Sequence, residues 1–212
     1  MKNLFFAILA TSLIFSCDKA KVDVKNSDKT DSLEKEEWKP VDSATATKAW
    51  MEFATPGDMQ KMLAKSDGKW IGETTSWMEN DAKPEKSISE ATNKMIFEGR
   101  YQVSEHKGNM MGMPFEGMSI VGYDNAKKKF VSTWIDNMGT GIMHSEGDWN
   151  ASKKTIEFKG QMTDPARPKT NCEIREVYTF VDDNTHTLEM FAPDPKTGKE
   201  FKTMDIKFTR KK

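Results

Sequence analysis

The chain has 212 residues, with 32 Lys and Arg against 33 Asp and Glu, so its formal net charge is −1 at neutral pH. This balance argues against a nucleic-acid partner, because binding to a phosphate backbone requires a strongly basic surface. Cys17 and Cys172 are the only cysteines, and with the first assigned below to lipidation, no intramolecular disulfide is expected.

Residues 1–16 are typical of a lipoprotein signal peptide. Lys2 gives a positive start, and an apolar run of about a dozen residues ends at Phe15, which is too short to span about 30 Å of hydrocarbon as a helix. The following Ser16-Cys17 completes a motif that resembles a lipobox. We therefore expect cleavage before Cys17, acylation of Cys17 with palmitate, and a membrane-anchored chain in a bacterial cell envelope. The alternative is a plain secretory signal cleaved near Cys17.

Residues 17–49 are polar and rich in charges of both signs. Such a segment buries too little apolar surface to offset its ordering entropy, so a disordered tether is expected. Trp38 and Trp50, in the tether and at its junction, are candidates for docking back onto the domain or onto a partner. Residues 50–212 remain for one folded domain.

A short helix is expected at the start of this domain. Thr55 is a candidate N-cap, Pro56 a suitable first helical residue, and Asp58 completes a capping box. Met59, Met62 and Leu63 then share one face, and Gly68 follows the end of the helix.

After Gly68 the chain reads as about ten short strands with turn residues between them. The expected strands are 69–77, 87–97, 99–106, 115–123, 129–136, 141–148, 154–161, 172–181, 185–192 and 200–209. Short links between consecutive strands favour an all-β, antiparallel up-and-down barrel, because closure removes the exposed strand edges. An open sandwich is the alternative.

Two sequence features resemble the calycin-like barrels, which include the lipocalins and fatty-acid-binding proteins. The first strand begins Gly68-Lys69-Trp70, similar to the Gly-x-Trp signature of that superfamily, and the last ends Phe208-Thr209-Arg210, similar to its closing arginine. The resemblance implies that Arg210 packs over Trp70 and joins the first strand to the last, a cation–π contact of about 0.5–2 kcal/mol.

A more specific resemblance lies in the middle of the chain. Met110 to Gly117, Gly122 to Asn125 and Ser132 to Gly141 look like the bacterial family called domain of unknown function 1579. The resemblance covers about residues 52–210. It implies a calycin-like barrel and an exported or envelope setting, and it implies no activity and no catalytic residues.

Methionine and aromatic residues form the candidate binding site. The expected function is to bind a small apolar or amphipathic ligand in the barrel or at its mouth, since concave aromatic sites take such ligands. The candidate residues are Met111, Met113, Phe115, Trp134, Met138, Met143 and His144. Trp77 and Trp149 are further candidates for the lining of the cavity.

Other functions remain as alternatives. Copper or haem binding through methionines and His144 is one, because thioethers are soft ligands and His144 would meet Asp136 inside a hollow barrel. No cofactor is expected otherwise. A solid, purely structural envelope component is another alternative.

Catalysis is not expected, because three scattered histidines define no triad and carboxylates such as Glu73, Glu90, Glu98, Glu116 and Glu146 are common in so charged a chain. His186 is expected at the surface and Cys172 as a buried, inert thiol.

Overall fold

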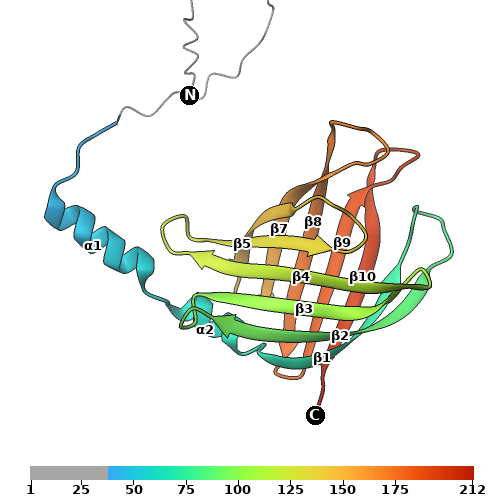
Figure 1. Cartoon of the computed structure of the whole chain (residues 1–212), viewed down its shortest axis with the longest axis horizontal. Coiled ribbons are helices and arrows are strands. Elements are labelled where there is room, and N and C mark those ends of the chain that lie inside the picture. The colour runs from blue at the N-terminus through green and yellow to red at the C-terminus, as the bar shows by residue number, and fades with distance from the viewer. Residues whose placement is uncertain (1–37) are drawn as a thin grey trace, which may run out of the picture. The chain divides into compact units, whose positions relative to one another are not determined.

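The computed structural model describes residues 38–212, and the expected signal peptide, Cys17 and most of the expected tether lie outside the described residues. Residues 41–212 form one compact unit. It consists of two short helices followed by ten strands (Figure 1). Among the described residues, no helix is long and apolar enough to cross a membrane.

The ten strands form one closed antiparallel barrel in which each strand pairs with its neighbours along the chain and β1 pairs with β10. This confirms the expected up-and-down barrel, and the open sandwich is wrong. The strands are β1 (Gly68–Ser76), β2 (Glu85–Ile96), β3 (Tyr101–Met110), β4 (Met113–Asp124), β5 (Lys129–Asp136), β6 (Met143–Asn150), β7 (Thr155–Thr163), β8 (Asn171–Asp182), β9 (Thr185–Pro193) and β10 (Glu200–Arg210).

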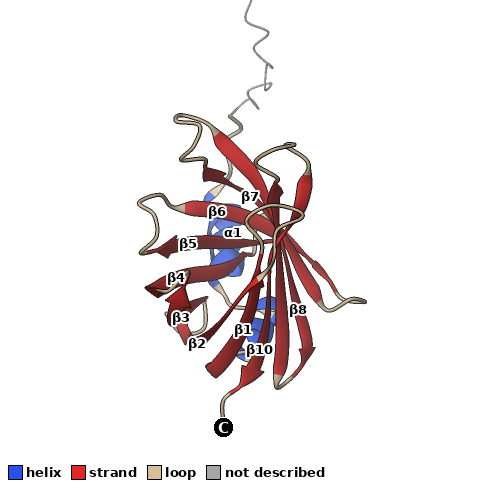
Figure 2. Ribbon diagram, turned by 90° about the vertical axis from the view of Figure 1, so that its right-hand side faces the viewer, coloured by secondary structure: helices blue, strands red, loops and turns tan. Residues whose placement is uncertain are grey.

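The barrel is flattened into two layers that face each other. In Figure 1, β2 to β5 run across the view, whereas β7 to β10 run nearly upright behind them. Figure 2, turned by 90°, shows the strands curling into one continuous sheet. The two layers supply the two main walls of the interior.

The hairpin turns depend on residues that adopt positive φ. Met111 (φ 53°) and Gly112 (φ 76°) form the two-residue connection between β3 and β4, a geometry that matches the twist of the paired strands. β3 therefore continues to Met110, four residues beyond its expected end, with Asn109 still paired to Pro114. Met111 is placed at a hairpin tip as a consequence.

The first helix, α1 (Ser43–Ala54), was not expected from the sequence. Asp42 caps its N-terminus, because Oδ1 accepts hydrogen bonds from the backbone N–H groups of Ala44 and Thr45, both at 3.0 Å. At the other end, the Asn125 side chain donates to the carbonyl oxygen of Thr55 at 2.8 Å. The expectation of disorder is thus wrong for residues 43–49.

The second helix, α2 (Asp58–Ala64), is the expected one, but its cap is different. Gly57 is the N-cap, and its N–H donates to Oε1 of Gln60 at 2.8 Å. Thr55 instead ends α1. Leu63 is buried, and Met59 and Met62 pack beside it as the helical spacing predicted.

The barrel closes through the contact expected between its first and last strands. The Arg210 guanidinium carbon lies 4.2 Å from the centre of the Trp70 ring. Its nitrogens also donate to the carbonyl oxygens of Asp67 (2.6 Å) and Lys65 (2.8 Å), in the segment that precedes β1. Gly68 is required beside them, because it has a φ of 124° and a Cβ there would lie 2.9 Å from Nη1 of Arg210.

Candidate functional site

The barrel encloses a cavity of about 820 Å³. One end is closed by α2, where Leu63 packs against Phe130, Ile156 and Phe158. β5 and β7 start beside this plug and end at the opposite side, where loop residues 138–142 and Pro165 line the cavity. We call this second side the mouth.

One wall of the cavity carries small polar side chains, and we call it the polar wall. It comes from β2 to β5, whose inward positions alternate with outward ones. Its members are Ser87, Ser89, Asn93, Ser104, Ser119 and Ser132. Short side chains leave space at the centre of the barrel, so the serines help to keep the interior hollow.

The facing wall, from β7 to β10, is mainly hydrophobic, and we call it the apolar wall. Its members are Phe158, Phe180, Leu188, Met190, Ile206 and Phe208. A cavity with one polar and one apolar wall suits an amphipathic molecule, because each part of such a molecule finds a matching surface.

Glu176 on β8 interrupts the apolar wall. Its partners across the strands are Phe158 on β7 and Met190 on β9. It makes no hydrogen bond or ion pair with any of residues 38–212, yet it lines the cavity. Burial alone raises the pKa of the Glu176 carboxyl to about 7, so near neutral pH this group exists in both charged and neutral forms.

A hydrogen-bonded chain crosses the polar wall from β3 to β2. Ser104 Oγ donates to Asn93 Oδ1 at 2.6 Å and lies 2.8 Å from His106 Nε2. The amide of Asn93 is oriented by Ser66, whose carbonyl oxygen accepts from Nδ2 at 3.1 Å. Because the Ser104 proton is committed to Asn93, His106 must donate through Nε2. Its Nδ1 is then the acceptor nitrogen.

The direction of the hydrogen bond from His106 to Ser104 has a chemical consequence. A serine activated for nucleophilic attack donates its proton to the histidine, whereas Ser104 accepts from His106. Burial also lowers the pKa of His106 to about 4, so the imidazole is neutral at physiological pH. The pair therefore lacks the hydrogen-bond direction of an activated serine nucleophile.

His186 lies inside the barrel, not at the surface as expected. Its side chain is 2% exposed, its ring centre is 4.4 Å from that of Trp70, and Nδ1 lies 2.8 Å from the Tyr178 hydroxyl. Burial, followed by the charge of Arg210, lowers its pKa to about 4. The polar turn beside it in the sequence suggested exposure, but the strand pairing directs the ring inward.

Four of the seven predicted binding residues line the cavity: Phe115, Trp134, Met138 and Met143. Trp134 and Phe115 stack with ring centres 6.3 Å apart, and Trp134 Nε1 donates to Asp136 Oδ2 at 2.7 Å. These residues lie toward the mouth: Phe115 near the start of β4, Trp134 near the end of β5, Met138 in the loop that follows, and Met143 at the start of β6.

The other three predicted residues lie elsewhere. Met111 and Met113 are 55% and 47% exposed at the hairpin between β3 and β4 and do not line the cavity. His144 is exposed, because Met143 and Ser145 on either side of it occupy the inward positions of β6. The alternative in which His144 meets Asp136 inside the barrel is therefore wrong.

Two further tryptophans also lie outside the cavity lining. Trp149 packs against Phe180, with ring centres 5.9 Å apart, in the core beside α2. Trp77 follows β1, and the ammonium of Lys202 lies 5.8 Å from its ring centre.

Metal-binding and redox-active groups are sparse in the described part of the chain. Within residues 38–212, no three His, Cys, Asp or Glu side chains come together in a group that could hold a metal ion. Cys172 is half-buried, and burial raises the pKa of its thiol, which favours the unreactive protonated form.

Sequence reasoning missed Glu176 and the serines of the polar wall. Glu176 lies in the run Glu173-Ile174-Arg175-Glu176, and no neighbouring sequence feature distinguishes it from the exposed Glu173. Strand parity offers the only signal, because Ile174, Glu176 and Tyr178 share one face. The carboxylates considered from the sequence did not include it.

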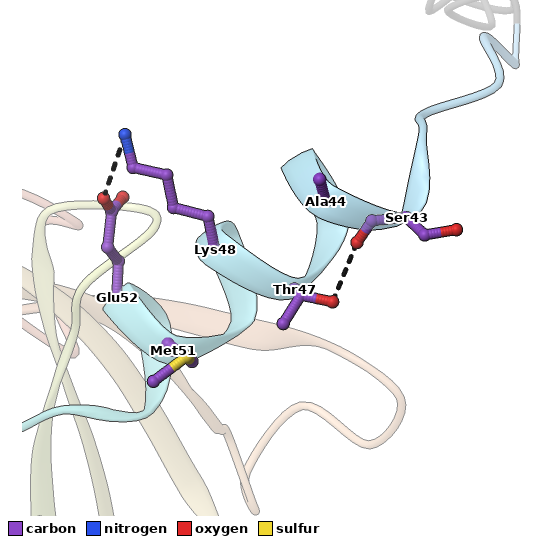
Figure 3. A pocket seen from close by; sticks show the side chains of 6 residues that line it. All are labelled: Ser43, Ala44, Thr47, Lys48, Met51 and Glu52. Carbon is purple, nitrogen blue, oxygen red and sulfur yellow. Dashed lines mark hydrogen bonds and ion pairs between the residues drawn. The ribbon is translucent and has the colours of Figure 1, made fainter.

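A second hollow lies on one face of α1, lined by Ser43, Ala44, Thr47, Lys48, Met51 and Glu52 (Figure 3). All six residues come from a single exposed helix. Lys48 and Glu52 form an ion pair across one turn at 3.9 Å. Because no second element within residues 38–212 encloses this surface, the barrel cavity is the candidate site.

Comparisons with known proteins agree with this fold. The model of a family described as "Protein of unknown function (DUF1579)" matches residues 55–210. No curated protein matches the sequence.

Two solved structures resemble the barrel at 10% sequence identity. Rv2717c from M. tuberculosis has a TM-score of 0.55, covering 74% of this chain and 100% of that one. The S-type phycobiliprotein lyase CPES from Guillardia theta has a TM-score of 0.52, covering 77% of this chain and 97% of that one. At this identity, the likeness concerns the calycin-like fold alone.

Proposed function

The chain belongs to the DUF1579 family, and because that description assigns no activity, we propose a function from the interior of the barrel: the protein binds a small amphipathic ligand in its cavity. The observation that carries this proposal is an enclosed space of about 820 Å³ with one polar and one apolar wall. Sites for small molecules have volumes of about 300–1,000 Å³ and a mainly apolar lining with a few polar groups.

Binding without catalysis is the form of the proposal that the geometry favours. In the Ser104–His106 hydrogen bond the serine is the acceptor, whereas an activated serine nucleophile is the donor. The carboxylate of Asp136 already accepts hydrogen bonds from Trp134 and from the backbone N–H of Met138. The hollow interior also favours a ligand carrier over a solid structural component.

The proposed cellular location is the bacterial cell envelope. It rests on the signal-like segment 1–16 and on the lipobox-like motif that ends at Cys17. A lipid on this cysteine would hold the barrel near a membrane without crossing it. Mass spectrometry of the N-terminal peptide would reveal the acyl groups, and the Cys17→Ser variant should lack them.

The ligand site is tested by filling the cavity. Ser119 on the polar wall faces inward between Ser104 and Trp134, whereas its neighbour Ile120 faces outward and is 38% exposed. Titration with Nile red, a neutral apolar dye, should give saturable binding that Ser119→Phe weakens at least tenfold. Ile120→Phe, the same aromatic side chain on the other face of β4, should leave the affinity unchanged.

Two results would contradict cavity binding. One is a failure of the unmodified protein to bind Nile red. The other is an equal loss of affinity in both phenylalanine variants, which would place the dye on the outer surface or reflect a general loss of structure. Circular dichroism of each variant separates these two explanations.

A further inference from the structure

We propose that the ligand carries a basic nitrogen, whose cation is held by the Glu176 carboxylate inside the barrel. The inference rests on the proposed function and specifies the chemical class of the ligand. It makes the cavity selective for cationic amphiphiles over neutral ones and strongly unfavourable to anionic ones such as fatty acids.

The charges of the lining support this selectivity. Among the described residues that line the cavity, none is Lys or Arg, whereas two are carboxyls, Glu176 and Asp136. An anionic headgroup would enter a low-dielectric space with no cation to neutralise it, at high electrostatic cost. A cationic headgroup would meet charges of the opposite sign.

Of the two carboxyls, Glu176 is the one left without a partner. Asp136 Oδ2 accepts from Trp134 Nε1 at 2.7 Å, and its Oδ1 accepts from the backbone N–H of Met138 at 2.9 Å. Glu176 has no hydrogen bond or ion pair within residues 38–212. A buried carboxylate is costly unless a cation or several donors satisfy it, so a ligand cation is the group that this position lacks.

The surroundings of Glu176 also suit a cation. Phe158 is its partner on β7, and Tyr178 is the next inward residue on β8. Aromatic rings attract cations through their negative faces. On the opposite wall, His106 keeps an acceptor nitrogen at Nδ1, because Nε2 is the donor to Ser104. The Glu176 carboxylate, His106 Nδ1 and the serine hydroxyls of the polar wall can all accept hydrogen bonds, and an ammonium group offers only donors.

The state of Glu176 makes this binding depend on pH. The inward partners of Glu176 on β7 and β9, Phe158 and Met190, are not titratable. Other titratable groups on the interior side of the strands include Tyr178 and Cys172 on the same strand, His186 on β9, His106 on β3, Tyr123 on β4 and Asp136 on β5. Burial raises the pKa of Glu176 to about 7, so the carboxylate predominates at pH 8 and the neutral acid at pH 5.5. An alkylammonium with a pKa near 10.4 stays charged throughout this range.

The test uses three probes with one alkyl chain and different headgroups: dodecylamine, dodecanol and dodecanoate. Each displaces Nile red from the purified mature chain at probe concentrations below micelle formation. At pH 8 we expect the amine to bind at least tenfold more tightly than the alcohol, and dodecanoate to bind most weakly. At pH 5.5 the preference for the amine should fall about tenfold.

Glu176→Gln should abolish the preference for the amine and leave the affinity for dodecanol unchanged. Glu173→Gln is the matched control, since Glu173 lies on the same strand, is exposed, and accepts a hydrogen bond from Gln161 outside the cavity. This control should retain the full preference. The pH profile of the unmodified protein gives an independent answer if the Glu176 variant does not fold.

The outcomes separate the two proposals. Equal binding of amine and alcohol at pH 8, or tighter binding of dodecanoate, overturns the basic-nitrogen ligand and leaves cavity binding in place. A preference that survives in Glu176→Gln overturns the role of this carboxyl. If neither Nile red nor any of the three probes binds, the proposed function fails, and the inference fails with it.

Discussion

Arg210 connects parts of the chain that are about 140 residues apart in sequence. Its side chain covers Trp70 and donates to the carbonyl oxygens of Lys65, Asp67 and Asp183, at distances between 2.6 and 2.9 Å. The planar guanidinium can reach these acceptors together because its donors form a fixed fork. Arg210 thus holds the segment before β1 against β10 and the β8–β9 turn.

Replacing Arg210 by Lys should lower the free energy of unfolding by about 2 kcal/mol, because the positive charge is retained while most of these hydrogen bonds are lost. Urea denaturation followed by tryptophan fluorescence measures this change. Lys211→Gln is the control, since Lys211 forms only an exposed ion pair with Glu90 at 2.6 Å, and exposed pairs contribute little. Similar losses in the two variants would contradict a special role for Arg210.

At the scale of elements, α1 is the helix or strand with the least packing against the rest of the described structure. None of its residues is buried, and Trp50 is 68% exposed. Its last turn is held by Asn125 in the β4–β5 turn, which donates to the carbonyl oxygens of Glu52, Phe53 and Thr55. Helix ends leave carbonyl groups without intrahelical partners, and here a distant turn supplies the donor.

Asn125→Ala should therefore loosen α1 and leave the barrel intact. We expect amide hydrogen exchange in residues 43–55 to become several-fold faster, because about 1 kcal/mol of hydrogen bonding to the helix end is removed. Exchange in β1 to β10 should not change. Asn150→Ala is the matched control, since Asn150 accepts hydrogen bonds within the β6–β7 turn only. Unchanged exchange in α1 would show that Asn125 does not hold this helix.

At the scale of the whole molecule, three titratable groups inside the barrel shape stability against pH. Burial lowers the pKa of His106 and of His186 to about 4 and raises that of Glu176 to about 7. Between pH 6.5 and 4 the unfolded histidines bind protons that the folded ones do not, so stability falls as the pH falls. Between pH 4.5 and 7 folded Glu176 binds the extra proton, so its contribution falls as the pH rises.

Below about pH 6 the stability lost through the two histidines exceeds the stability gained through Glu176, so stability falls toward acid pH. Near pH 7 the loss caused by ionisation of Glu176 predominates. We therefore expect maximal stability at about pH 6–7. Chemical denaturation between pH 4 and 8 measures this curve. In Glu176→Gln the stability at pH 8 should rise by about 1–3 kcal/mol, and the gain should vanish near pH 5. A gain of equal size at both values would mean that Glu176 is not buried as a titrating group.

The number and order of the strands were predictable because turns are local. Gly68, the Asp124-Asn125 turn and the Asp182-Asp183-Asn184 turn mark strand ends through their own backbone preferences. The long-range contact between Arg210 and Trp70 came from the family resemblance. The early end expected for β3 was wrong because the sequence does not reveal how far two paired strands continue to bond.

It was harder to predict which side chains of a strand point into the barrel, because apolar residues normally face the inside. In β2 the apolar Ile88 is 66% exposed, while Ser87 and Ser89 on either side of it line the cavity. His186 was assigned to the wrong side, and the alternative that placed His144 inside the barrel is wrong. A hollow barrel with a polar wall reverses the usual pattern, so periodicity alone places some of its residues outside.

The sequence by itself determined that this chain forms an all-β barrel, because turn chemistry and strand propensity act between near neighbours. It also supplied four of the residues that line the cavity, through their aromatic and thioether character. Only the tertiary structure decided that Glu176 stands alone in an apolar wall and that Ser104 accepts a hydrogen bond from His106. Those properties arise from burial and from pairing across strands, which depend on how distant segments meet in space.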